Sequence, residues 1–575
     1  MNLAAIRHRS TGSDCYALDS DTVVLNLWTD HSVKAVSVVS EDPFIHELHR
    51  RRAWEGKPTP MRRLYELAHQ VVWTAELKPA YKRLQYYFVV EDEDERLGVF
   101  ENKICPMEER DRISTEYFKF PWINPSDVIA PPDWVRDTVW YQIMPDRFAR
   151  SSDAPSDPKF RRWGDFSDPH FGELYGGNLR GIRERLPYLR QLGVSGIYLT
   201  PIFLSNSNHK YNTFDYYKVD PDFGSEQDLC ALVQNAHALG MRIMLDAVFN
   251  HCGTEFFAWK DVCEKGRASR YFDWFFINRD DFVKDDFSVA DGRFYTFSFW
   301  AGMPKLNTNN PEVQRYFTDL CVHWVGDLDI DGIRFDVGDE ISHSFLRRVN
   351  AAVKAAKPET FLLGEIWFDA IGWLGGFEYD SVMNYPFTGA VGDFWRDREM
   401  TARDFMHRLN FCRSLYPRQI NEALFSFLDT HDTARVRESC RNQNEMLQKL
   451  AILLTMAGTP CLYYGTEIAM KGAHTPYNRS TMPWDEIDAG KFDRFKSKVS
   501  ALVRVRGEQP DLRRDEMTFF FDESLPRLVG YRKGAVTVLL NAGDTPAPVA
   551  AAQEILFSNG YKNGTLLPDG VLLCK

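Results

Sequence analysis

IDGIRFDV, at residues 330–337, decides the fold. It is a short apolar run that ends in charged residues, and it follows an amphipathic stretch at 311–328. The same two patterns alternate at 194–249, where VSGIYLTPI, SEQDLCALVQNAHALG and MRIMLDAVF follow one another. A strand covered on both faces is apolar throughout, and the helices that cover a parallel sheet are amphipathic. The alternation therefore predicts parallel strands joined by helical crossovers.

Eight apolar runs of this kind can be found outward from that segment. They are TVWYQIM (138–144), VSGIYLTPI (194–202), MRIMLDAVF (241–249), IDGIRFDV (330–337), TFLLGEI (360–366), DSVMNY (380–385), ALFSFLD (423–429) and GTPCLYYG (458–465). Helical patterns occupy most of the gaps between them. Eight strand–helix units predict an α/β fold, the (β/α)₈ TIM barrel, at residues 126–507. A long gap after the third strand predicts an inserted subdomain at about residues 252–302.

The segments on both sides of the predicted barrel have β patterns. DTVVLNLWT (21–29) and LQYYFVVED (84–92) are rich in β-branched and aromatic residues, so residues 1–125 are predicted to form an N-terminal β-sandwich. The proline-rich segment 121–133 is predicted to be a linker. Strand patterns return near the end of the chain, where residues 508–575 are predicted to form a C-terminal β-sandwich.

Composition excludes several classes of partner. The 575 residues carry a formal net charge of −12, whereas nucleic acids and anionic membranes select basic surfaces. The ten cysteines include no CxxC pair, which is typical of a reduced cytosolic protein. The N-terminal sequence MNLAAIRHRSTGSDCYALD contains no apolar segment like that of a secretion signal, and no apolar run is long enough to span a bilayer. We expect a cytoplasmic location.

Polar residues follow several of the predicted strands directly. In a barrel enzyme, the active-site groups come from the C-terminal ends of different strands. The polar residues found at such positions are Asp246, Asn250, His251, Arg334, Asp336, Glu365, Asp429, His431 and Asp432.

The segment GIRFDV is the most informative of these strand ends. Strand side chains alternate between faces, so Arg334 and Asp336 are predicted to share one face and Ile333, Phe335 and Val337 the other. A nearby guanidinium lowers the pKa of a carboxyl group, which suits a carboxylate nucleophile. A purely structural Arg–Asp pair is the alternative interpretation.

Glu365 and Asp432 complete a set of carboxyl groups with Asp336. Burial of Glu365 beside Trp367 would favour its protonated form, as an acid that protonates a leaving oxygen requires. Cleavage of a glycosidic bond needs one ionised and one protonated carboxyl group. Neutral His251 and His431 could bind sugar hydroxyls. Because the chain has neither HExxH nor GxxxxGK[ST], the set fits glycoside cleavage better than metal-dependent hydrolysis or phosphoryl transfer.

The strand-end segments also resemble a known family. DAVFNH (246–251), GIRFDVGDE (332–340), GEIW (364–367) and FLDTHD (427–432) resemble the four hallmark segments of the α-amylase superfamily, in family order. The resemblance implies that Asp336 is the nucleophile, Glu365 the general acid/base and Asp432 an assisting carboxylate. The substrate-binding residues that it implies are Tyr211, Asp246, His251, Arg334, Trp367, His431 and Arg479.

The segment MPKLN (303–307) narrows the resemblance to the neopullulanases, cyclomaltodextrinases and maltogenic amylases. The N-terminal domain resembles their carbohydrate-binding-type β-domain, which implies a homodimer. The substrates implied are cyclodextrins, pullulan and short maltooligosaccharides. Two alternatives stay open: an α-glucosidase-like or transglycosylating enzyme on linear maltooligosaccharides, and a non-catalytic carbohydrate-binding or transporter-associated relative.

Several residues depart from the family pattern. Asn212 and Thr466 stand where Asp is common, and Phe368 stands where His usually follows the tryptophan of GEIW. The Phe368 position faces acceptor subsites, which leaves open the balance between hydrolysis and transglycosylation. In the calcium loop after the first strand, Asp153 and Asp157 are retained, but Asn178 replaces a common Asp. Calcium depends on carboxylate ligands, so its binding is left open, and no cofactor is expected to be required.

The predicted insertion is rich in aromatic residues. They include Phe256, Phe257, Trp259, Tyr271, Phe272, Trp274, Phe275, Phe276, Phe294, Tyr295, Phe299 and Trp300. An insertion after a barrel strand lies at the catalytic face. We expect most of these rings to form the insertion's own core and a few to stack on sugar rings.

Overall fold

The computed structural model describes residues 1–49, 54–112, 114–154, 156–167, 169–170, 172–284, 286–550 and 554–575. Pro155, within the predicted calcium loop, therefore lies outside the described residues. The chain folds into two compact units. One contains residues 1–131, 374–376 and 398–421, and the other contains residues 132–373, 377–397 and 422–575.

The first unit is built on two antiparallel sheets. One sheet has the order β1 (Cys15–Ala17), β2 (Val23–Thr29), β6 (Val71–Leu77), β5 (Arg62–Glu66). The other has the order β4 (Lys57–Pro60), β3 (Ala35–Glu41), β7 (Leu84–Glu91), β8 (Arg96–Val99), β9 (Ile104–Pro106), and β10 (Phe118–Phe120) pairs with β7. Alternate residues such as Leu25, Trp73 and Phe88 form one core cluster, as the strand period requires. Helices α10 (Ala402–Ser414) and α11 (Arg418–Asn421) belong to this unit.

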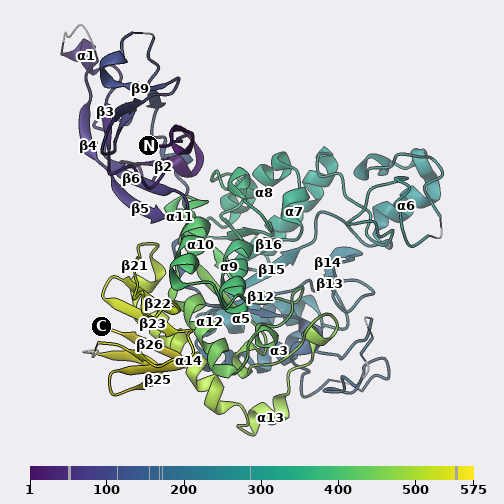
Figure 1. Ribbon diagram of the computed structural model, residues 1–575. Coiled ribbons are helices and arrows are strands. Elements are labelled where there is room, and N and C mark those ends of the chain that lie inside the picture. The colour runs from purple at the N-terminus through teal and green to yellow at the C-terminus, as the bar shows by residue number, and fades with distance from the viewer. Residues whose placement is uncertain are drawn as a thin grey trace. The chain divides into compact units, whose positions relative to one another are not determined.

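The second unit contains a closed ring of eight parallel strands. Their order is β18 (Ser381–Val382), β17 (Phe361–Gly364), β16 (Gly332–Phe335), β15 (Arg242–Ala247), β12 (Gly196–Leu199), β11 (Trp140–Ile143), β20 (Thr459–Tyr463), β19 (Phe425–Ser426). A parallel bridge between Met383 and Phe425 closes the ring. All eight predicted strands are present, so the predicted barrel is confirmed. Figure 1 shows these strands surrounded by helices.

Helices of the same unit surround the barrel strands (Figure 1). They are α3 (Leu179–Glu184), α4 (Leu186–Leu192), α5 (Glu226–Ala238), α7 (Pro311–Gly326), α8 (His343–Ala356), α9 (Tyr385–Arg396), α12 (Gln443–Thr455), α13 (Trp484–Asp488) and α14 (Asp493–Glu508). Helix α5 starts with a capping box formed by Ser225 and Asp228. Helix α4 ends at Gly193, whose φ of 96° needs a residue without a Cβ.

The barrel interior is filled by large side chains rather than left open. Trp140, Tyr198, Met244, Leu363 and Phe425 belong to one buried cluster, and each comes from a different strand. Polar groups can therefore gather only where the strands end. Among the described residues, no helix has both the length and the apolar character needed to cross a membrane.

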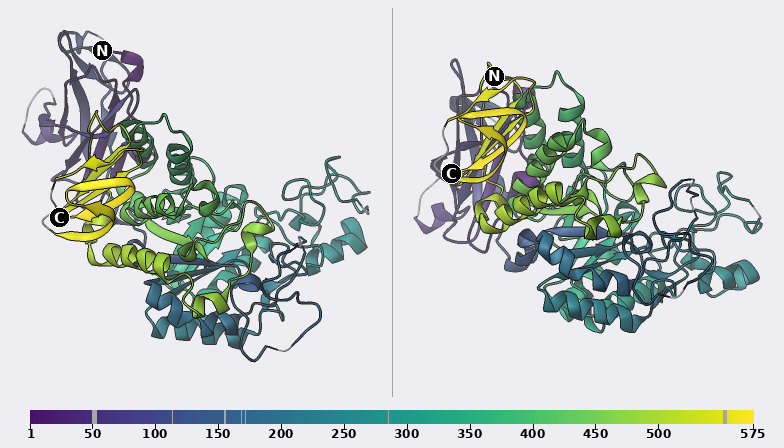
Figure 2. Two further views of the ribbon diagram at one scale, coloured as in Figure 1. Left: turned by 60° about the horizontal axis from the view of Figure 1, so that its bottom comes forward. Right: turned by 90° about the horizontal axis from the view of Figure 1, so that it is seen from below.

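The insertion follows β15 and carries helix α6 (Phe257–Lys265), which stands apart from the barrel strands in Figures 1 and 2. Trp259 packs against Phe275 and Phe294, with ring centroids 4.8 and 4.9 Å apart. Part of the aromatic set thus forms the insertion's own core, as expected. A short hairpin, β13 (Phe203–Leu204) and β14 (Asp215–Val219), follows β12.

An antiparallel C-terminal domain follows α14, as predicted. Its strands are β21 (Thr518–Phe520), β22 (Leu528–Lys533), β23 (Val536–Asn541), β24 (Ala547–Pro548), β25 (Ile555–Lys562) and β26 (Thr565–Cys574). Strand β26 pairs with β23, β24 and β25, so the two halves of the domain share this strand. The sheet lies beside α12 and α14 in Figure 2.

Candidate active site at the barrel mouth

The candidate site lies at the C-terminal ends of the barrel strands. A cavity of about 570 Å³ opens there. Its lining includes seven of the residues predicted from sequence: Tyr211, His251, Asp336, Glu365, Trp367, Asp432 and Arg479. The other three predicted residues, Asp246, Arg334 and His431, contact members of this lining. The structure thus brings together the catalytic and substrate-binding residues that the sequence predicts.

Arg334 contacts three carboxyl groups. Its Nη1 donates to Asp246 Oδ1 and to Asp336 Oδ1, each at 2.8 Å. Its Nη2 lies 2.7 Å from Glu365 Oε2. Each of the four residues is less than a tenth exposed. One cation therefore faces three buried acids, and a cluster with excess negative charge holds a proton more readily than an isolated carboxyl group does.

The pKa of Asp336 differs from the sequence expectation. We expected the Arg334 guanidinium to lower it. In the structure, burial raises the pKa of Asp336 well above its usual value, Arg334 opposes this, and the charges of Glu365 and Asp246 raise it further. The effect of the guanidinium has the expected sign, but desolvation and the other two carboxyl groups, which the expectation left out, outweigh it.

Val337 also lies differently from its predicted place. Strand β16 ends at Phe335, and Val337 adopts a left-handed conformation with φ 47°. Its side chain lines the cavity instead of continuing the apolar face. Its N–H donates to Glu365 Oε2 at 3.0 Å. A β-branched residue in this region is strained, so the turn is held by its surroundings and aims a backbone donor at the carboxylate.

Glu365 receives two further donors. The indole Nε1 of Trp367 and the hydroxyl of Tyr385 each donate to Oε1 at 3.2 Å. The rings of Trp367 and Tyr385 are stacked, with centroids 3.8 Å apart. Trp367 is still 54% exposed, so one face of the ring remains open to the solvent beside Glu365. Both oxygens of this carboxyl group are oriented by the protein.

Asp246 supports the cluster from the neighbouring strand. Tyr198 and Tyr211 donate their hydroxyls to its Oδ2 at 2.6 and 2.8 Å. Burial raises the pKa of Asp246, and Arg334 opposes that effect. The ring of Tyr211 stacks parallel to His431, with centroids 5.3 Å apart. Asp246 therefore fixes both the guanidinium and a ring that lines the cavity.

Asp432 is the most accessible of the three predicted catalytic acids. Its side chain is 37% exposed, and its Oδ1 accepts from Arg479 Nη2 at 3.0 Å. Gln142 donates to Nδ1 of His431 at 2.8 Å. Because Nδ1 accepts, the proton of the neutral ring lies on Nε2, which is 3.0 Å from Asp432 Oδ2. The hydrogen bond from Arg479 thus orients this carboxylate, and His431 Nε2 lies beside it.

The histidines of the site are neutral. Burial lowers the pKa of His209 and of His251 to about 3, and it lowers the pKa of His431 well below the usual value. Nε2 of His251 lies 3.1 Å from the carbonyl of Tyr211, to which it donates. His251 therefore lines the cavity while one of its ring nitrogens is already engaged by the protein.

Part of the cavity lining is apolar. Phe297 and Trp300, from the insertion, and Met303, just after it, line the cavity together with the carboxyl groups. The ring of Phe297 stacks on His251 at 5.0 Å. Trp300 was among the insertion aromatics singled out from the sequence. Phe297, His209, Met303 and Tyr385 were missed. The first three lie in segments between barrel strands, and Tyr385, the last residue of the predicted strand 380–385, begins helix α9 instead.

The departures from the family pattern occupy three different environments. Asn212 is buried, and its Oδ1 accepts a hydrogen bond from the Ser205 hydroxyl at 2.6 Å. Thr466 donates to Asp429 at 3.2 Å. Burial raises the pKa of Asp429 to about 6. Phe368 is 52% exposed, directly follows Trp367 in the sequence and has its ring edge-on to Trp373, with centroids 6.1 Å apart. Of these, Phe368 alone presents an apolar ring to solvent.

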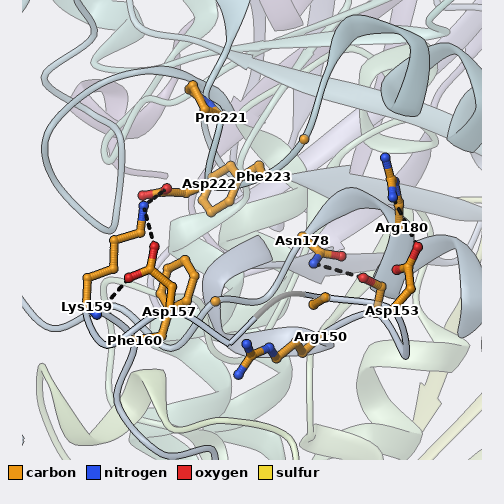
Figure 3. A pocket seen from close by; sticks show the side chains of 14 residues that line it. Arg150, Asp153, Asp157, Lys159, Phe160, Asn178, Arg180, Pro221, Asp222 and Phe223 are labelled. Atoms are coloured by element: carbon orange, nitrogen blue, oxygen red, sulfur yellow. Dashed lines mark hydrogen bonds and ion pairs between the residues drawn. The ribbon is translucent and has the colours of Figure 1, made fainter.

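The predicted calcium loop has its charges paired within the protein, as Figure 3 shows. Asp153 accepts from Arg180 at 3.1 Å. Asp157 lies 3.6 Å from Lys159, which also pairs with Asp222. The three predicted metal residues line one pocket of about 250 Å³ together with these cations.

Asn178 offers the loop a donor rather than an acceptor. Its Oδ1 accepts from the N–H of Gly181 at 2.8 Å and thereby caps α3. Its Nδ2 consequently faces Ser151 Oγ at 3.2 Å. Calcium requires six to eight oxygen ligands, and no cluster of three acidic, His or Cys ligands occurs in the described parts of the chain. The residues present do not fit a calcium site in this arrangement.

Comparisons with known proteins agree with this geometry. The family pattern described as "Alpha amylase, catalytic domain" matches residues 142–514, and "Alpha amylase, N-terminal ig-like domain" matches residues 1–124. A cyclomaltodextrinase of Geobacillus thermopakistaniensis is 42% identical over 562 residues, which cover 96% of this chain and 94% of the relative. An intracellular maltogenic amylase of Bacillus subtilis is 41% identical over 493 residues, which cover 84% and 81%.

Among solved structures, a cyclomaltodextrinase matches with a TM-score of 0.89 at 34% identity and covers 100% of both chains. The resemblance predicted from the strand-end segments is therefore confirmed. The catalytic-domain match contains all three catalytic carboxyl residues predicted from the sequence, and these lie at one cavity. The chain belongs to the α-amylase family and is a glycoside hydrolase.

Proposed function

We propose that the chain is a retaining hydrolase of α-glucosidic bonds in cyclodextrins, pullulan and short maltooligosaccharides. The observation that carries this proposal is the sharing of Arg334 by Asp336 and Glu365 at one cavity. The named relatives, a cyclomaltodextrinase and a maltogenic amylase, support the substrate class.

Asp336 is the nucleophile in the proposed reaction. Its carboxylate attacks the anomeric carbon, and the bond to the leaving oxygen breaks as Glu365 transfers a proton to that oxygen. A covalent glycosyl ester on Asp336 results. Water then attacks the same carbon, Glu365 takes a proton from it, and the ester bond breaks. Arg334 contacts both acids throughout, so it can offset the charge that moves between them.

Asp432 binds the sugar next to the scissile bond. Its open side faces the cavity, while Arg479 and His431 hold its other side. A carboxylate in this position can accept hydrogen bonds from two adjacent hydroxyls and favour a distorted ring. Tyr211 supplies a flat face beside it. These contacts act most strongly in the transition state if the ring is flattened there.

The apolar part of the cavity lining supports the substrate class. Phe297, Trp300 and Met303 provide an apolar surface, and the faces of glucose rings and the inner wall of a cyclodextrin are apolar. A substrate that is already closed into a ring loses little conformational freedom when it binds. Cyclic and short substrates are therefore favoured over long starch chains.

A second candidate activity is transglycosylation or α-glucosidase-like action on linear maltooligosaccharides. The exposed rings of Trp367 and Phe368 beside Glu365 favour it. Such rings can bind an acceptor sugar at the position from which water would attack. The acceptor hydroxyl would then replace water in the second step.

A substrate panel separates the two activities. Purified protein is incubated with β-cyclodextrin, pullulan, maltotriose and starch, and products are followed by chromatography with anomeric detection by NMR. We expect the highest kcat/KM on β-cyclodextrin, with α-configured first products. With maltotriose as the substrate, dominant products longer than maltotriose would favour transfer. With any substrate, β-configured products would overturn the retaining mechanism.

Three further properties are proposed on coarser support. We infer that no calcium is required, because Asp153 and Asp157 are paired with cations and Asn178 presents its amide nitrogen.

A homodimer is proposed from the Ig-like N-terminal domain match, and light scattering of the purified chain tests it. A cytoplasmic location is proposed from the intracellular relative, and fractionation of the source cells tests it.

A further inference from the structure

Arg147 is a buried arginine outside the cavity lining. It lies in the helical turn α2 (Pro145–Phe148), directly after β11, and is 1% exposed. Its Nη1 donates to the carbonyl of Arg479 at 2.9 Å, and its Nη2 donates to the carbonyl of Glu173 at 2.8 Å. Its own carbonyl accepts from the N–H of Met482 at 3.0 Å. Arg147 thus connects the 479–482 segment to the end of the first barrel strand through two hydrogen bonds.

Asp146 fixes the orientation of this guanidinium. Its Oδ2 accepts from Arg147 Nε at 2.6 Å. Its Oδ1 accepts from the backbone N–H groups of Tyr175 and Gly176 at 2.9 and 3.0 Å. The ring of Tyr175 lies under the guanidinium, 4.5 Å from its central carbon. Held on three sides, Arg147 has a single orientation in which its remaining donors point at the Arg479 and Glu173 carbonyls.

Arg479 needs this support because it stands in a short 3₁₀ turn, Tyr477–Arg479. Its side chain reaches Asp432 through Nη2 at 3.0 Å and the carbonyl of His431 through Nε at 2.8 Å. The position of a long side chain depends on the position of the backbone that carries it. Displacement of the Arg479 backbone would therefore change the position of Asp432.

We propose that Arg147 is a positioning residue for the reaction, which acts on Asp432 through the backbone of Arg479. The inference rests on the proposed role of Asp432. Arg147, a residue of α2, thus affects catalysis although it does not line the cavity. Because precise placement of an assisting carboxylate matters most in the transition state, the loss should appear in kcat rather than in KM.

The first test is Arg147→Lys in the full chain. Lysine keeps the charge next to Asp146 but cannot bond to two carbonyls and a carboxylate in the fork geometry of arginine. We expect kcat on the best α-glucan substrate to fall about tenfold, with KM changed less than about twofold, at a temperature well below Tm.

Arg506→Lys is the matched control. Arg506 is also 1% exposed, and it donates to the backbone carbonyls of Leu454, Met456 and Gly458, away from the site. It should lose Tm to a similar extent and retain the wild-type kcat per folded molecule. Equal loss of kcat in both variants would mean that Arg147 acts through general stability, and would overturn the proposal.

A double-mutant cycle with Arg479→Lys identifies the route. If Arg147 acts through Arg479, adding Arg147→Lys to Arg479→Lys should lower kcat less than about twofold further. Multiplicative losses would overturn the proposed route. Should Arg147→Lys fail to fold, Asp146→Asn with Arg147→Met removes the buried pair without leaving an unpaired charge, and the same cycle applies. A wild-type chain inactive on every α-glucan would instead overturn the proposed function.

Discussion

Two groups of acidic residues in the barrel unit are organised in opposite ways. At the barrel mouth, Asp246, Asp336 and Glu365 share the single guanidinium of Arg334. All of these side chains are nearly excluded from solvent. The negative charge exceeds the positive charge, and the excess is confined beside a cavity.

Three acidic residues in and around the loop between β11 and α3 pair with two exposed cations. Asp153 pairs with Arg180, whose side chain is 49% exposed. Asp157 and Asp222 lie beside Lys159, whose side chain is 46% exposed. Solvent screens these pairs, and each of the two cations pairs with two acids, whereas Arg334 contacts three.

The difference teaches that acid count does not define a functional cluster. Both groups contain three carboxyl groups. The first was singled out from the sequence in full, and of the second Asp153 and Asp157 were singled out. Burial and shared neutralisation make the first group hold a proton and place charge where a reaction can use it. The acids of the second group are paired with solvent-exposed cations, which leaves them with a structural role.

The largest expected effect comes from removing a catalytic acid at the barrel mouth, with the removal of an acid in the loop as the control. Asp336→Asn should lower kcat/KM on β-cyclodextrin on the order of a thousandfold or more, because the nucleophile is lost. Glu365→Gln should do the same by removing the proton donor. Steady-state kinetics with Tm as a folding check measures this. Asp157→Asn, the matched control, should leave kcat/KM unchanged, and an equal loss there would break the comparison.

The next effect comes from the two arginines. Arg334→Lys should lower kcat/KM about a hundredfold, because a point charge cannot contact three carboxyl groups in the geometry of a guanidinium. Arg180→Lys should change kcat/KM less than about twofold. Measuring both variants on one substrate tests whether sharing, rather than charge, distinguishes the groups. Full activity of Arg334→Lys would refute that distinction.

The pH dependence gives a smaller effect of defined sign. Asp336 must be ionised to attack, and burial raises its pKa. As pH falls through that raised value, the carboxylate gains a proton and kcat/KM declines. The acid limb of the kcat/KM profile should therefore lie above about pH 4, the range of an ordinary aspartate. A limb at or below pH 4 would show that the shared guanidinium outweighs burial.

The smallest effect is expected in the loop. Lys159→Met should lower Tm by roughly 1–2 °C, because exposed ion pairs contribute little to stability. Adding calcium chloride or a chelator to the wild-type chain should shift Tm by less than about 1 °C. Differential scanning calorimetry measures both. A calcium-dependent rise of several degrees would show that the loop can rearrange its pairs around the ion.

Much of the fold could be predicted because the strands are marked by uninterrupted apolar runs. The ends of those runs also placed Asp336, Glu365 and Asp432 at one face of the barrel, since parallel strands end together. Local sequence could not place Val337, because its left-handed turn is imposed by contacts of the surrounding loops. A strictly alternating strand would have carried its side chain away from the cavity.

The remaining differences concern interactions between distant segments. Phe297 reaches the cavity from the insertion, and its position depends on how some fifty residues fold. Asn178 was judged by its residue type, whereas its oxygen is committed to capping α3. The pKa of Asp336 depends on burial that only the assembled barrel creates. Each of these depends on tertiary placement that periodicity does not encode.

The pairing of β11 with β20 has a consequence for how the protein is made. Trp140 lies opposite Cys461, so the first barrel strand acquires one of its two neighbours only when most of the chain has left the ribosome. At about 5–20 residues per second, that interval lasts roughly 15–60 s. Throughout it, one edge of a strand that is fully buried in the folded protein has no partner, and this is the period in which nascent chains are most exposed to aggregation and to chaperones.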